Sequence, residues 1–345
     1  MKDGWTYKKL GEICDIYQPK TLSSNMLLPD GKYAVYGANG IIGRYDKYNH
    51  ESSEVLMTCR GATCGTINVS EPFSWINGNA MVIHPQSDEL NKSYLVYVLK
   101  GIDLSNVITG AAQPQITRQS LSPTKIPIPP IAEQERIVAE LDLLQGIIEK
   151  KKEQLKAYDQ LAQSIFYTMF GDPIDNPKGW EVKKLGQVYK LKSGDGLSAK
   201  QFIEGQYPVY GGNGISGYHN SFNMDGDYII IGRVGAYCGN VRYVSGKFWL
   251  TDNAFQLIYD EKEQHPVFIK HLLTVLDLHQ YANHAAQPVI SNITLKEVKV
   301  LFPPLSLQEE FAEKVEAIER QKALVQQSIE ETQTMFDYTM DKYFG

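Results

Sequence analysis

The chain has 345 residues, of which 43% are hydrophobic, so it is long enough for two or three globular domains with ordinary apolar cores. This composition excludes disorder as the main state. Its four cysteines include no CxxC pair and are too few for a disulfide scaffold, which favours a reducing compartment. Residues 1–10 lack the apolar core of a signal peptide, and no apolar run approaches the roughly 18 residues of a membrane span. We therefore expect a soluble, cytoplasmic protein.

The net charge of −6 is distributed unevenly along the chain. Residues 1–130 carry +1 and residues 176–304 carry +2, whereas residues 131–175 carry −4 and residues 305–345 carry −5. The acid is therefore confined to two short segments. Because a local patch attracts a polyanion more than the global charge repels it, the acidity of the whole chain does not exclude a nucleic-acid partner.

The second half of the chain repeats the first at an offset of about 174 residues. Between residues 111 and 135, 11 of 25 positions are identical to those one offset later, against about one in 15 expected from composition. Five motifs recur in the same order: GWTYKKLG from Gly4 as GWEVKKLG from Gly179, VYGANGIIGRY from Val35 as VYGGNGISGYH from Val209, CRGATCG from Cys59 as GRVGAYCG from Gly232, GNAMVI from Gly78 as DNAFQLI from Asp252, and AAQPQI from Ala111 as AAQPVI from Ala285. Such self-similarity indicates an internal duplication.

Each half begins with a globular segment of mixed secondary structure. Short apolar runs between glycine-rich turns predict strands in both halves, at residues 55–58, 81–83, 228–231 and 255–258. Short helices are predicted around residues 93–99 and 267–276. Because strands and helices do not alternate in a regular βαβ rhythm, we expect an α+β fold rather than a doubly wound sheet.

A long helix is predicted to close each half. Its core positions recur with 4,3,4,3 spacing, which is the heptad seam of a coiled coil. The two seams are related by the repeat offset and keep the same frame, and they consist of Ile137, Leu141, Leu144, Ile148, Lys151, Leu155, Tyr158, Ala162, Ile165 and Met169, and of Phe311, Val315, Ile318, Lys322, Val325, Ile329, Thr332, Phe336, Thr339 and Tyr343. A proline pair before each helix and a Phe-Gly pair after it favour these limits. About 39 residues of helix would span roughly 58 Å.

These patterns divide the chain into four parts. We expect one globular domain over residues 1–130, a helix over residues 131–171, a second globular domain over residues 172–304 and a second helix over residues 305–345. Residues 172–178 contain two prolines and form a natural linker into the second globular domain. The acidic excess lies on the two helices, where it indicates either a solvated face or a partner-binding face.

The sequence contains no convincing catalytic or cofactor motif. Gly212, Gly214 and Gly217 satisfy GxGxxG, but no helix is predicted at the third glycine, so a turn with positive φ is favoured over a dinucleotide site. The Glu-x-Lys pattern at residues 297–299 has lost its acid in the counterpart at residues 123–125, which weakens a nuclease interpretation. Neither methyltransferase motif, FxGxG or [DNS]PP[YF], is present, and the histidines lack the paired spacing of a metal site. We therefore expect no catalytic residue, cofactor or metal in this chain.

The duplicated motifs, followed in each half by PPxxxQE and a long heptad helix, resemble the specificity (S) subunits of type I restriction and modification systems. The resemblance covers both halves and nearly the whole chain. It implies that each globular segment is a target recognition domain for double-stranded DNA and that the two helices pack as an antiparallel coiled coil. It also implies that the helices space the two domains and dock two methyltransferase (M) subunits, with restriction (R) subunits as further candidate partners. S-adenosylmethionine would then be bound by the M subunits.

Two features depart from the family pattern. Residues 17–20 read YQPK where residues 192–194 read the more typical KSG, so the family pattern does not define the loop geometry in the first half. We also expect no closing segment beyond the second helix, although some relatives have one.

Residues that both halves share cannot distinguish two different half-sites, so they are expected to serve as framework or as phosphate contacts. The candidate phosphate contacts are Lys8, Lys9, Arg60, Lys183, Lys184 and Arg233. The alternative is a solvated charge pair for the lysines and a structural bond within the glycine-rich turn for the arginines. A second shared group either bonds adenine edges or supports the turns, and it comprises Tyr36, Asn39, Gln113, Tyr210, Asn213 and Gln287.

Residues that read bases are expected where the two copies diverge. The candidate segments are residues 18–32 with 192–206, and residues 44–54 with 218–227, because both pairs flank the shared glycine turn. The side chains in them with suitable hydrogen-bonding groups are Gln18, Lys20, Ser24, Asn25, Arg44, Lys192, Ser193, Lys200, Gln201, His219 and Asn220.

Two other classes of function stay open. One is an enzyme that acts alone, against which the missing catalytic motifs speak. The other is a coiled-coil adaptor or structural protein without sequence-specific DNA recognition. The sequence favours a non-catalytic DNA-recognition subunit that delivers an adenine methyltransferase, with or without a nuclease, to a two-part site.

Overall fold

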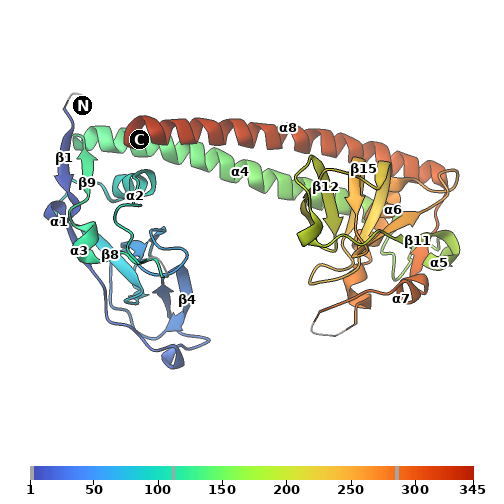
Figure 1. Cartoon of the computed structure of the whole chain (residues 1–345), viewed down its shortest axis with the longest axis horizontal. Helices are drawn as coiled ribbons and strands as arrows, with labels where there is room; N and C mark the ends of the chain where they lie inside the picture. The colour runs from blue at the N-terminus through green and yellow to red at the C-terminus, as the bar shows by residue number, and fades with distance from the viewer. Residues whose placement is uncertain (1–3, 111–112, 284–286) are drawn as a thin grey trace. The chain divides into compact units, whose positions relative to one another are not determined.

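The computed structural model describes residues 4–110, 113–283 and 287–345. The chain divides into two compact units, of which unit 1 combines Met1–Lys151 with Ser328–Gly345 and unit 2 is Lys152–Gln327. Each unit therefore contains one globular region together with a part of both long helices (Figure 1). The predicted division into four parts, with each helix as a part of its own, stays a prediction.

Unit 1 is built on two sheets and a ribbon. The four-stranded antiparallel sheet has the order β2-β8-β5-β6, with strands Cys14–Tyr17, Ala80–Pro85, Val55–Thr58 and Ile67–Val69. The second sheet has the order β4-β3-β7, with strands Gly40–Tyr45, Tyr33–Gly37 and Trp75–Ile76, and the ribbon pairs β1 with β9, which are Thr6–Lys9 and Lys125–Ile128. The short helices are α1, η1, α2 and α3, at Leu10–Ile13, Ser24–Met26, Lys92–Gly101 and Arg118–Leu121.

The core of unit 1 lies between the four-stranded sheet and helix α2. All four residues of β5 are buried, because this strand lies inside its sheet and both of its faces are covered. Helix α2 begins where the Asn91 side chain accepts a hydrogen bond from the backbone N–H of Tyr94. Tyr94 and Leu95 are buried on α2 and pack in one cluster with Met57 of the sheet. The unbroken apolar run seen in the sequence is thus an interior strand.

Unit 2 contains one six-stranded sheet in the order β11-β16-β14-β15-β12-β13. Its strands are, in that order, Lys190–Ser193, Ala254–Ile258, Met224–Gly232, Val241–Leu250, Tyr207–Gly211 and Gly214–His219. A ribbon pairs β10 with β17, which are Val182–Lys184 and Lys299–Leu301. The helices are α5, η2, α6, η3 and α7, at Leu185–Val188, Ala199–Gln201, Pro266–Val275, Leu278–Tyr281 and Asn292–Lys296.

One strand accounts for the difference in sheet topology between the two units. The long strand β15 pairs with β14 along most of its length and with β12 at its end. In unit 1 the equivalent positions of the repeat form two separate strands, β6 and β7, which belong to different sheets. Because β15 is continuous, the strands of unit 2 form one sheet, whereas the equivalent strands of unit 1 form two separate sheets.

The predicted strands and short helices are confirmed in both units. Residues 55–58 form β5, and the other three predicted strands lie within β8, β14 and β16. The two predicted short helices correspond to α2 and α6. Helices and sheets without a regular βαβ order make the fold α+β, as the sequence indicated.

The GxGxxG pattern lies in a β-hairpin and not at the start of a helix. Gly214 opens β13 with φ of 101°, and Gly40 occupies the equivalent position in the β3–β4 hairpin with φ of 107°. Only glycine adopts such values readily, so both turns need it. Gly217 lies inside β13, where no helix follows. The predicted turn is confirmed.

The two long helices are α4 (Ile131–Phe170) and α8 (Leu305–Phe344), each of 40 residues. Each starts directly after its proline pair, as predicted. Every seam position predicted on them is buried or half-buried, whereas most positions between are exposed. None of the helices that the structure describes is long and apolar enough to cross a membrane.

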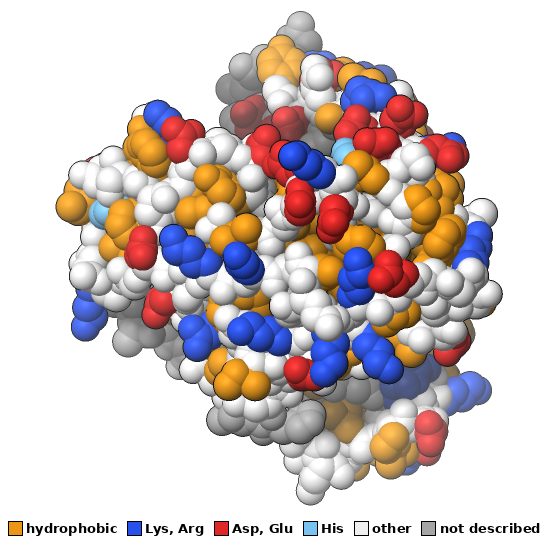
Figure 2. Space-filling model, turned by 90° about the vertical axis from the view of Figure 1, so that its right-hand side faces the viewer, with side chains coloured by type: hydrophobic (Ala, Val, Ile, Leu, Met, Phe, Trp, Pro, Cys, Tyr) orange, Lys and Arg blue, Asp and Glu red, His pale blue; other side chains and the backbone are white. Residues whose placement is uncertain are grey.

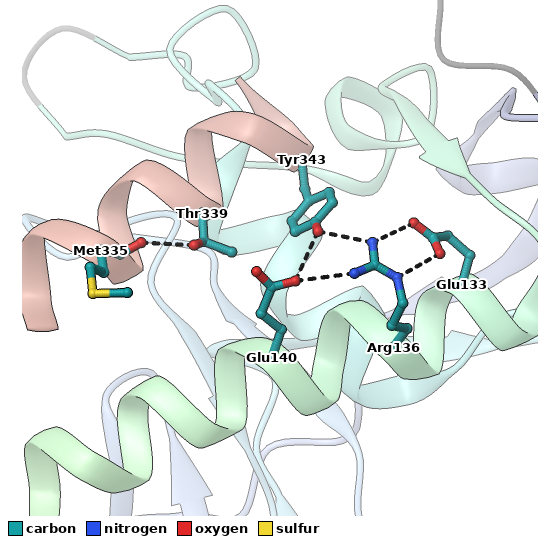
Figure 3. A network of polar contacts seen from close by, with 6 residues as sticks. All are labelled: Glu133, Arg136, Glu140, Met335, Thr339 and Tyr343. Atoms are coloured by element: carbon teal, nitrogen blue, oxygen red, sulfur yellow. Dashed lines mark hydrogen bonds and ion pairs between the residues drawn. The ribbon is translucent and has the colours of Figure 1, made fainter.

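Polar contacts join the two long helices inside each unit. In unit 1 the Tyr343 hydroxyl donates to Glu140 Oε2 at 2.9 Å and accepts from Arg136 at 2.9 Å, in the network that Figure 3 shows. Further along the same pair of helices, Lys151 Nζ donates to the backbone carbonyl of Ser328 at 3.2 Å. Residue numbers therefore rise on α4 as they fall on α8, so the helices run in opposite directions in this unit. In unit 2 Lys322 Nζ lies 2.7 Å from Asp159 Oδ1.

The end of each long helix completes the core of the globular region that belongs to the other half of the sequence. Tyr343 and Phe344, at the end of α8, are buried in the core cluster of unit 1. Phe166 and Phe170, at the end of α4, are fully buried in the core cluster of unit 2. Each globular region therefore shares its core with a helix end from the opposite half.

Candidate nucleic-acid interface

A groove of about 400 Å³ lies in unit 2 beside the β12–β13 hairpin. One part of its wall is shared between the two sequence copies, including Asn213, Gly214 and Gly235. Another part, from Leu197 to Phe202, comes from a segment in which the copies diverge. The structure thus places a shared scaffold next to variable side chains, which is the arrangement expected where similar folds read different sequences.

Glycines allow the shared motifs to approach one another in unit 2. A Cβ on Gly212 would lie 2.0 Å from the carbonyl oxygen of Val234, and one on Gly232 would lie 2.2 Å from that of Gly212. The GRVGAYCG motif also contacts the AAQPVI motif, because Gly235 N–H donates to the carbonyl of Pro288 at 2.9 Å. The hairpin, the GRVGAYCG motif and the end of the AAQPVI motif therefore meet at this groove, although residues 285–286 lie outside the described part of the chain.

The same motifs meet in unit 1. Gly61 N–H donates to the carbonyl of Pro114 at 3.0 Å, and Arg60 forms an isolated bridge with Gln115. The Asn39 side chain of the hairpin accepts a hydrogen bond from Thr63 Oγ1 at 2.6 Å. Residues 111–112 of the AAQPQI motif lie outside the described residues. The shared framework is thus duplicated in three dimensions as well as in sequence.

The two candidate arginines lie at this junction. Arg233 Nη1 is 3.4 Å from the carbonyl oxygen of Asp252, and its guanidinium lies 5.2 Å from the ring centroid of Phe255. Its buried Nε has no hydrogen-bond partner among the described residues. Because that Nε is buried, an additional acceptor such as a phosphate oxygen can reach only the exposed Nη side of the guanidinium.

Arg60 is exposed, and its structural counterpart is Val234, because Arg60 bridges Gln115 as Val234 bridges Val289. Arg233 takes the place of Cys59, so the expected correspondence of the two arginines is wrong.

The four candidate lysines lie at the ribbons, each close to a carboxylate. The Nζ atoms of Lys8 and Lys9 are 3.4 Å and 3.7 Å from the carboxylate oxygens of Glu89 and Glu12. In unit 2, Lys184 lies 2.6 Å from Glu297, while Lys183 lies 3.6 Å from Glu181 and 3.5 Å from the ring centroid of Phe302. This geometry favours the solvated charge pair, which was the alternative to a phosphate contact.

Two predicted base readers of unit 1, Gln18 and Arg44, make hydrogen bonds to backbone carbonyls of the loops. Gln18 Nε2 donates to the carbonyl of Gly78 at 2.9 Å and lies 3.0 Å from Cys59 Sγ. The Arg44 guanidinium donates to two backbone carbonyls of residues 31–32. Lys20, Ser24 and Asn25 are exposed, the last two on η1.

The reader candidates of unit 2 divide in the same way. His219 is buried, and its Nδ1 lies 3.0 Å from the backbone N of Ile203. Gln201 accepts from the Ser198 backbone at 2.9 Å, which holds η2. Ser193 Oγ lies 3.3 Å from the carbonyl oxygen of Asp252. All candidates of unit 2 except His219 are exposed, namely Lys192, Ser193, Lys200, Gln201 and Asn220.

The shared polar candidates differ in exposure. The Tyr36 hydroxyl is largely buried and accepts from the Glu71 backbone N–H at 3.1 Å, and Tyr210 packs edge-on against Phe248. These tyrosines belong to the framework. Asn213 and Gln287 are exposed and line the groove, and Gln113 is exposed in unit 1.

Two groove residues were missed by sequence reasoning. Phe202 lines the groove from the divergent segment, and Asn253 lines it from the shared Asn-Ala pair of the GNAMVI and DNAFQLI motifs. The signal for Asn253 was present, because its counterpart Asn79 is also an asparagine. Phe202 had no such signal, since an aromatic residue in a variable loop is most often a local packing residue.

A second missed feature is a polar cluster found only in unit 1. Tyr17 Oη lies 2.9 Å from His50 Nε2, and His84 Nδ1 lies 2.7 Å from Glu54, whose side chain is 4% exposed. Burial lowers the pKa of His50. The equivalent positions in the second half of the chain are Leu191, Met224, Tyr228 and Ile258. The two units therefore present different polar surfaces at equivalent places.

The electrostatics and thiol chemistry do not suggest a catalytic centre. Burial raises the pKa of the Cys238 thiol, which favours the protonated, poorly nucleophilic form. Among the residues that the structure describes, no three His, Cys, Asp or Glu side chains gather as a metal site would need. Figure 2 shows lysine and arginine side chains spread over one face, with acidic side chains among them and gathered towards its upper part. Charge on this face is mixed and not concentrated in one basic patch.

Comparison with known proteins identifies relatives for both halves. A family model described as the type I restriction modification DNA specificity domain matches residues 2–157 and again residues 177–333. The specificity subunit of the type I restriction enzyme EcoprrI from Escherichia coli is 35% identical over 151 residues, covering 41% of this chain and 37% of that protein. A putative type I specificity subunit from Mycoplasma pneumoniae is 25% identical over 257 residues, covering 69% of this chain and 68% of that protein.

Solved structures share the fold. The crystal structure of a type I restriction-modification S subunit from M. genitalium superimposes with a TM-score of 0.63 at 20% identity, covering 99% of this chain and 96% of that one. A chain from a study of assembly and conformational transition of the type I R-M system gives a TM-score of 0.58 at 18% identity, covering 100% and 98%. Because the family model matches most of each half, the chain belongs to the family of type I restriction modification DNA specificity domains.

Proposed function

We propose that this chain is the DNA-recognition subunit of a type I restriction and modification complex, in which each globular region reads one half of a two-part DNA site. The observation that carries the proposal is the duplication. The family model matches each half once, and the same shared motifs meet in each unit, in unit 2 beside side chains that differ between the copies. Two similar frameworks with different variable residues are suited to two different half-sites.

The groove of unit 2 suggests how a half-site would be read. Its glycine-rich wall lets a DNA backbone approach closely, while Asn213 and Gln287 offer amide groups that can pair with base edges. Phe202 and the exposed Lys200 lie in the divergent segment, where a contact would differ between the two domains. Arg233 would contribute a phosphate contact at the same junction.

The long helices would pair as an antiparallel coiled coil that sets the distance between the two half-sites. The buried seam positions and the polar contacts between α4 and α8 in each unit support this role. The helices also carry exposed apolar side chains outside the seam, among them Leu143, Leu324 and Tyr338, which are 65%, 60% and 71% exposed. Such residues suit the docking of partner proteins, for which two M subunits are proposed, with R subunits as further partners.

In this proposal the chain itself performs no chemistry. S-adenosylmethionine would be bound by the M subunits, and the adenine would be methylated there. This chain would supply the position of the complex on DNA. The absence of methyltransferase and nuclease motifs from the sequence motivates this division of labour.

Domain exchange tests the proposal. Replacing residues 1–130 by the equivalent segment of a relative, and adding M subunits, is expected to change one half of the modified site and leave the other half intact. The reason is that each globular region has its own framework and its own variable residues. Sequencing of modified adenines across a whole genome measures both halves at once.

The unmodified chain provides the control. Alone it is expected neither to methylate nor to cleave DNA, and modification should appear only with M subunits. Turnover that scales with the concentration of this chain alone would contradict the proposal. DNA binding without any sequence preference, even with M subunits present, would favour the adaptor function instead.

The arginines provide a second test. Arg233→Ala is expected to weaken binding to all sequences alike and to reduce the slope of log affinity against log salt by about one, because one phosphate contact is lost. Lys184→Ala, which removes an ammonium already paired with Glu297, should leave the slope nearly unchanged. Binding measured across salt on several duplexes separates the outcomes. A variant that loses preference at one base pair with an unchanged slope would make Arg233 a base reader.

A further inference from the structure

Two buried glutamines lie at the start of the long helices, and neither lines the groove where DNA reading is proposed. Gln134 and Gln308 are fully buried and occupy equivalent positions of the repeat, each in the first turn of its helix. A buried polar side chain costs stability unless its groups are hydrogen-bonded, so such a residue usually serves a specific geometry.

The two glutamines make the same three hydrogen bonds. In unit 1 Gln134 Nε2 donates to the carbonyls of Pro129 at 2.9 Å and Glu89 at 2.8 Å, and its Oε1 accepts from Asn91 N–H at 2.9 Å. In unit 2 the equivalent bonds of Gln308 run to Pro303, Glu263 and His265, at 2.8 Å, 3.3 Å and 2.9 Å. All partners are backbone groups. The bonds therefore do not depend on the side chains that have diverged.

Each glutamine connects three parts of its unit. Pro129 follows strand β9 of the ribbon, Glu89 and Asn91 precede the start of α2, and Gln134 itself belongs to α4. One side chain thus ties the ribbon and the helix that covers the sheet to the first turn of the long helix. With its acceptor and both donors satisfied, the amide allows little change in the angle at which the helix leaves the globular region.

A second contact between globular region and helix differs between the units. In unit 1 the Tyr97 hydroxyl of α2 donates to Asp142 of α4. In unit 2 the equivalent residue is His271, which packs edge-on against Phe311 and whose pKa burial lowers to about 3. The three hydrogen bonds of Gln134 and Gln308, here called the glutamine clamp, are the same in both units. The contact between α2 or α6 and the long helix is instead a hydrogen bond in unit 1 and an aromatic contact in unit 2. The clamp is therefore the better candidate for a common geometric requirement.

We propose that Gln134 and Gln308 are positioning residues that hold each recognition domain at a fixed angle on its helix and so determine how strictly the complex selects the gap between two half-sites. The inference rests on the proposed function. It assigns the glutamines no contact with DNA, so they should affect neither the bases that are read nor the salt dependence of binding.

The test uses Gln134→Met and Gln308→Met in the full chain with M subunits. Methionine keeps nearly the same volume but makes none of the three bonds. Methylation is measured on duplexes that carry both half-sites with the preferred gap, one base pair less and one base pair more. Relative to the preferred gap, the rate on the altered gaps is expected to rise by about tenfold, because several buried hydrogen bonds that held the angle are lost. Preferred bases and salt slope should stay as in the unsubstituted chain.

Glu135→Gln and Glu309→Gln are matched controls, since these exposed neighbours lie on the same helix turns. They should leave gap selection unchanged. Folded Gln→Met variants that select the gap as strictly as the unsubstituted chain would overturn the proposal. If the unsubstituted chain with M subunits methylated DNA at no specific sequence, the proposed function itself would be refuted.

Hydrogen exchange covers the case in which a variant is less stable. Local loosening predicts faster exchange at the amides of Asn91 and His265, which lose their acceptor, with the sheets still protected. That result supports a positioning role. Loss of protection throughout the whole unit would make the glutamine a general stability residue and would overturn the proposal.

Discussion

Inserting one heptad after Lys151 and one after Val325 is expected to lengthen the gap between the two half-sites by about three base pairs. Seven residues add about 10 Å at about 1.5 Å per residue and keep the seam in register. Along B-DNA, at about 3.4 Å per base pair, this corresponds to roughly three base pairs. The bases recognised in each half-site should not change.

The structure supports these insertion points. The boundary between the two compact units falls between Lys151 and Lys152 on α4 and between Gln327 and Ser328 on α8, so the insertions lie at or close to it. Lys151 keeps its partner Ser328 in unit 1 because both lie on the same side of the insertions. The cores of both units are left intact.

Mapping modified adenines in cells that carry the extended chain and M subunits measures the new gap. Insertion of two residues in place of seven is the control, since two residues turn the seam by about 200° and should abolish modification or lower it strongly. DNA bending can absorb part of the added length, which would give a gap increase below three base pairs. If the extended chain still directed full modification of sites with the original gap, the helices would not set the distance between the half-sites.

Phe170→Ala is expected to destabilise unit 2 by about 3–5 kcal/mol, the usual cost of removing a buried phenylalanine ring. Phe170 is fully buried at the end of α4, with its ring centroid 4.7 Å from that of Phe268 and 5.4 Å from that of Phe311. These rings come from α6 and α8. One substitution therefore loosens the contact among both long helices and the globular region.

Denaturant unfolding of the full chain measures this effect, and hydrogen exchange locates it. Tyr338→Ala is a suitable control, because that ring is 71% exposed on α8 and should cost less than about 0.5 kcal/mol. We expect protection to fall in unit 2 and to persist in the sheet of unit 1. Equal stability changes for the two variants would show that the end of α4 does not complete the core of unit 2.

The elements and the repeat could be predicted from the sequence because they depend on local patterns. Heptad spacing and the proline pairs predicted both long helices, and short apolar runs predicted strands such as β5. The glycine turns were also predictable, since a residue type with special φ is visible in the sequence. The separate strands β6 and β7 of unit 1 and the single strand β15 of unit 2 were not, because strand pairing depends on distant partners.

The candidate site was predicted in outline but not residue by residue. The shared turn and the divergent segment 192–206 both line the groove of unit 2, whereas the other divergent segment, 218–227, supplies none of the groove residues. It did not show that Arg44 and His219 bond backbone groups, or that the candidate lysines lie beside carboxylates. A donor suitable for a base is equally suitable for a nearby carbonyl, and only the folded structure shows which acceptor is close.

The sequence by itself determined the duplication, the α+β class, the two long helices and the family to which the chain belongs. These features depend on short motifs and on the spacing of apolar residues along the chain. Only the tertiary structure decided which distant residues complete each unit. Tyr343 bonds Glu140 across 203 positions of sequence, and Phe170 fills a core built from the other half. Apolar burial and buried hydrogen bonds act between neighbours in space, and no local pattern encodes which helix end will supply the missing part of a core.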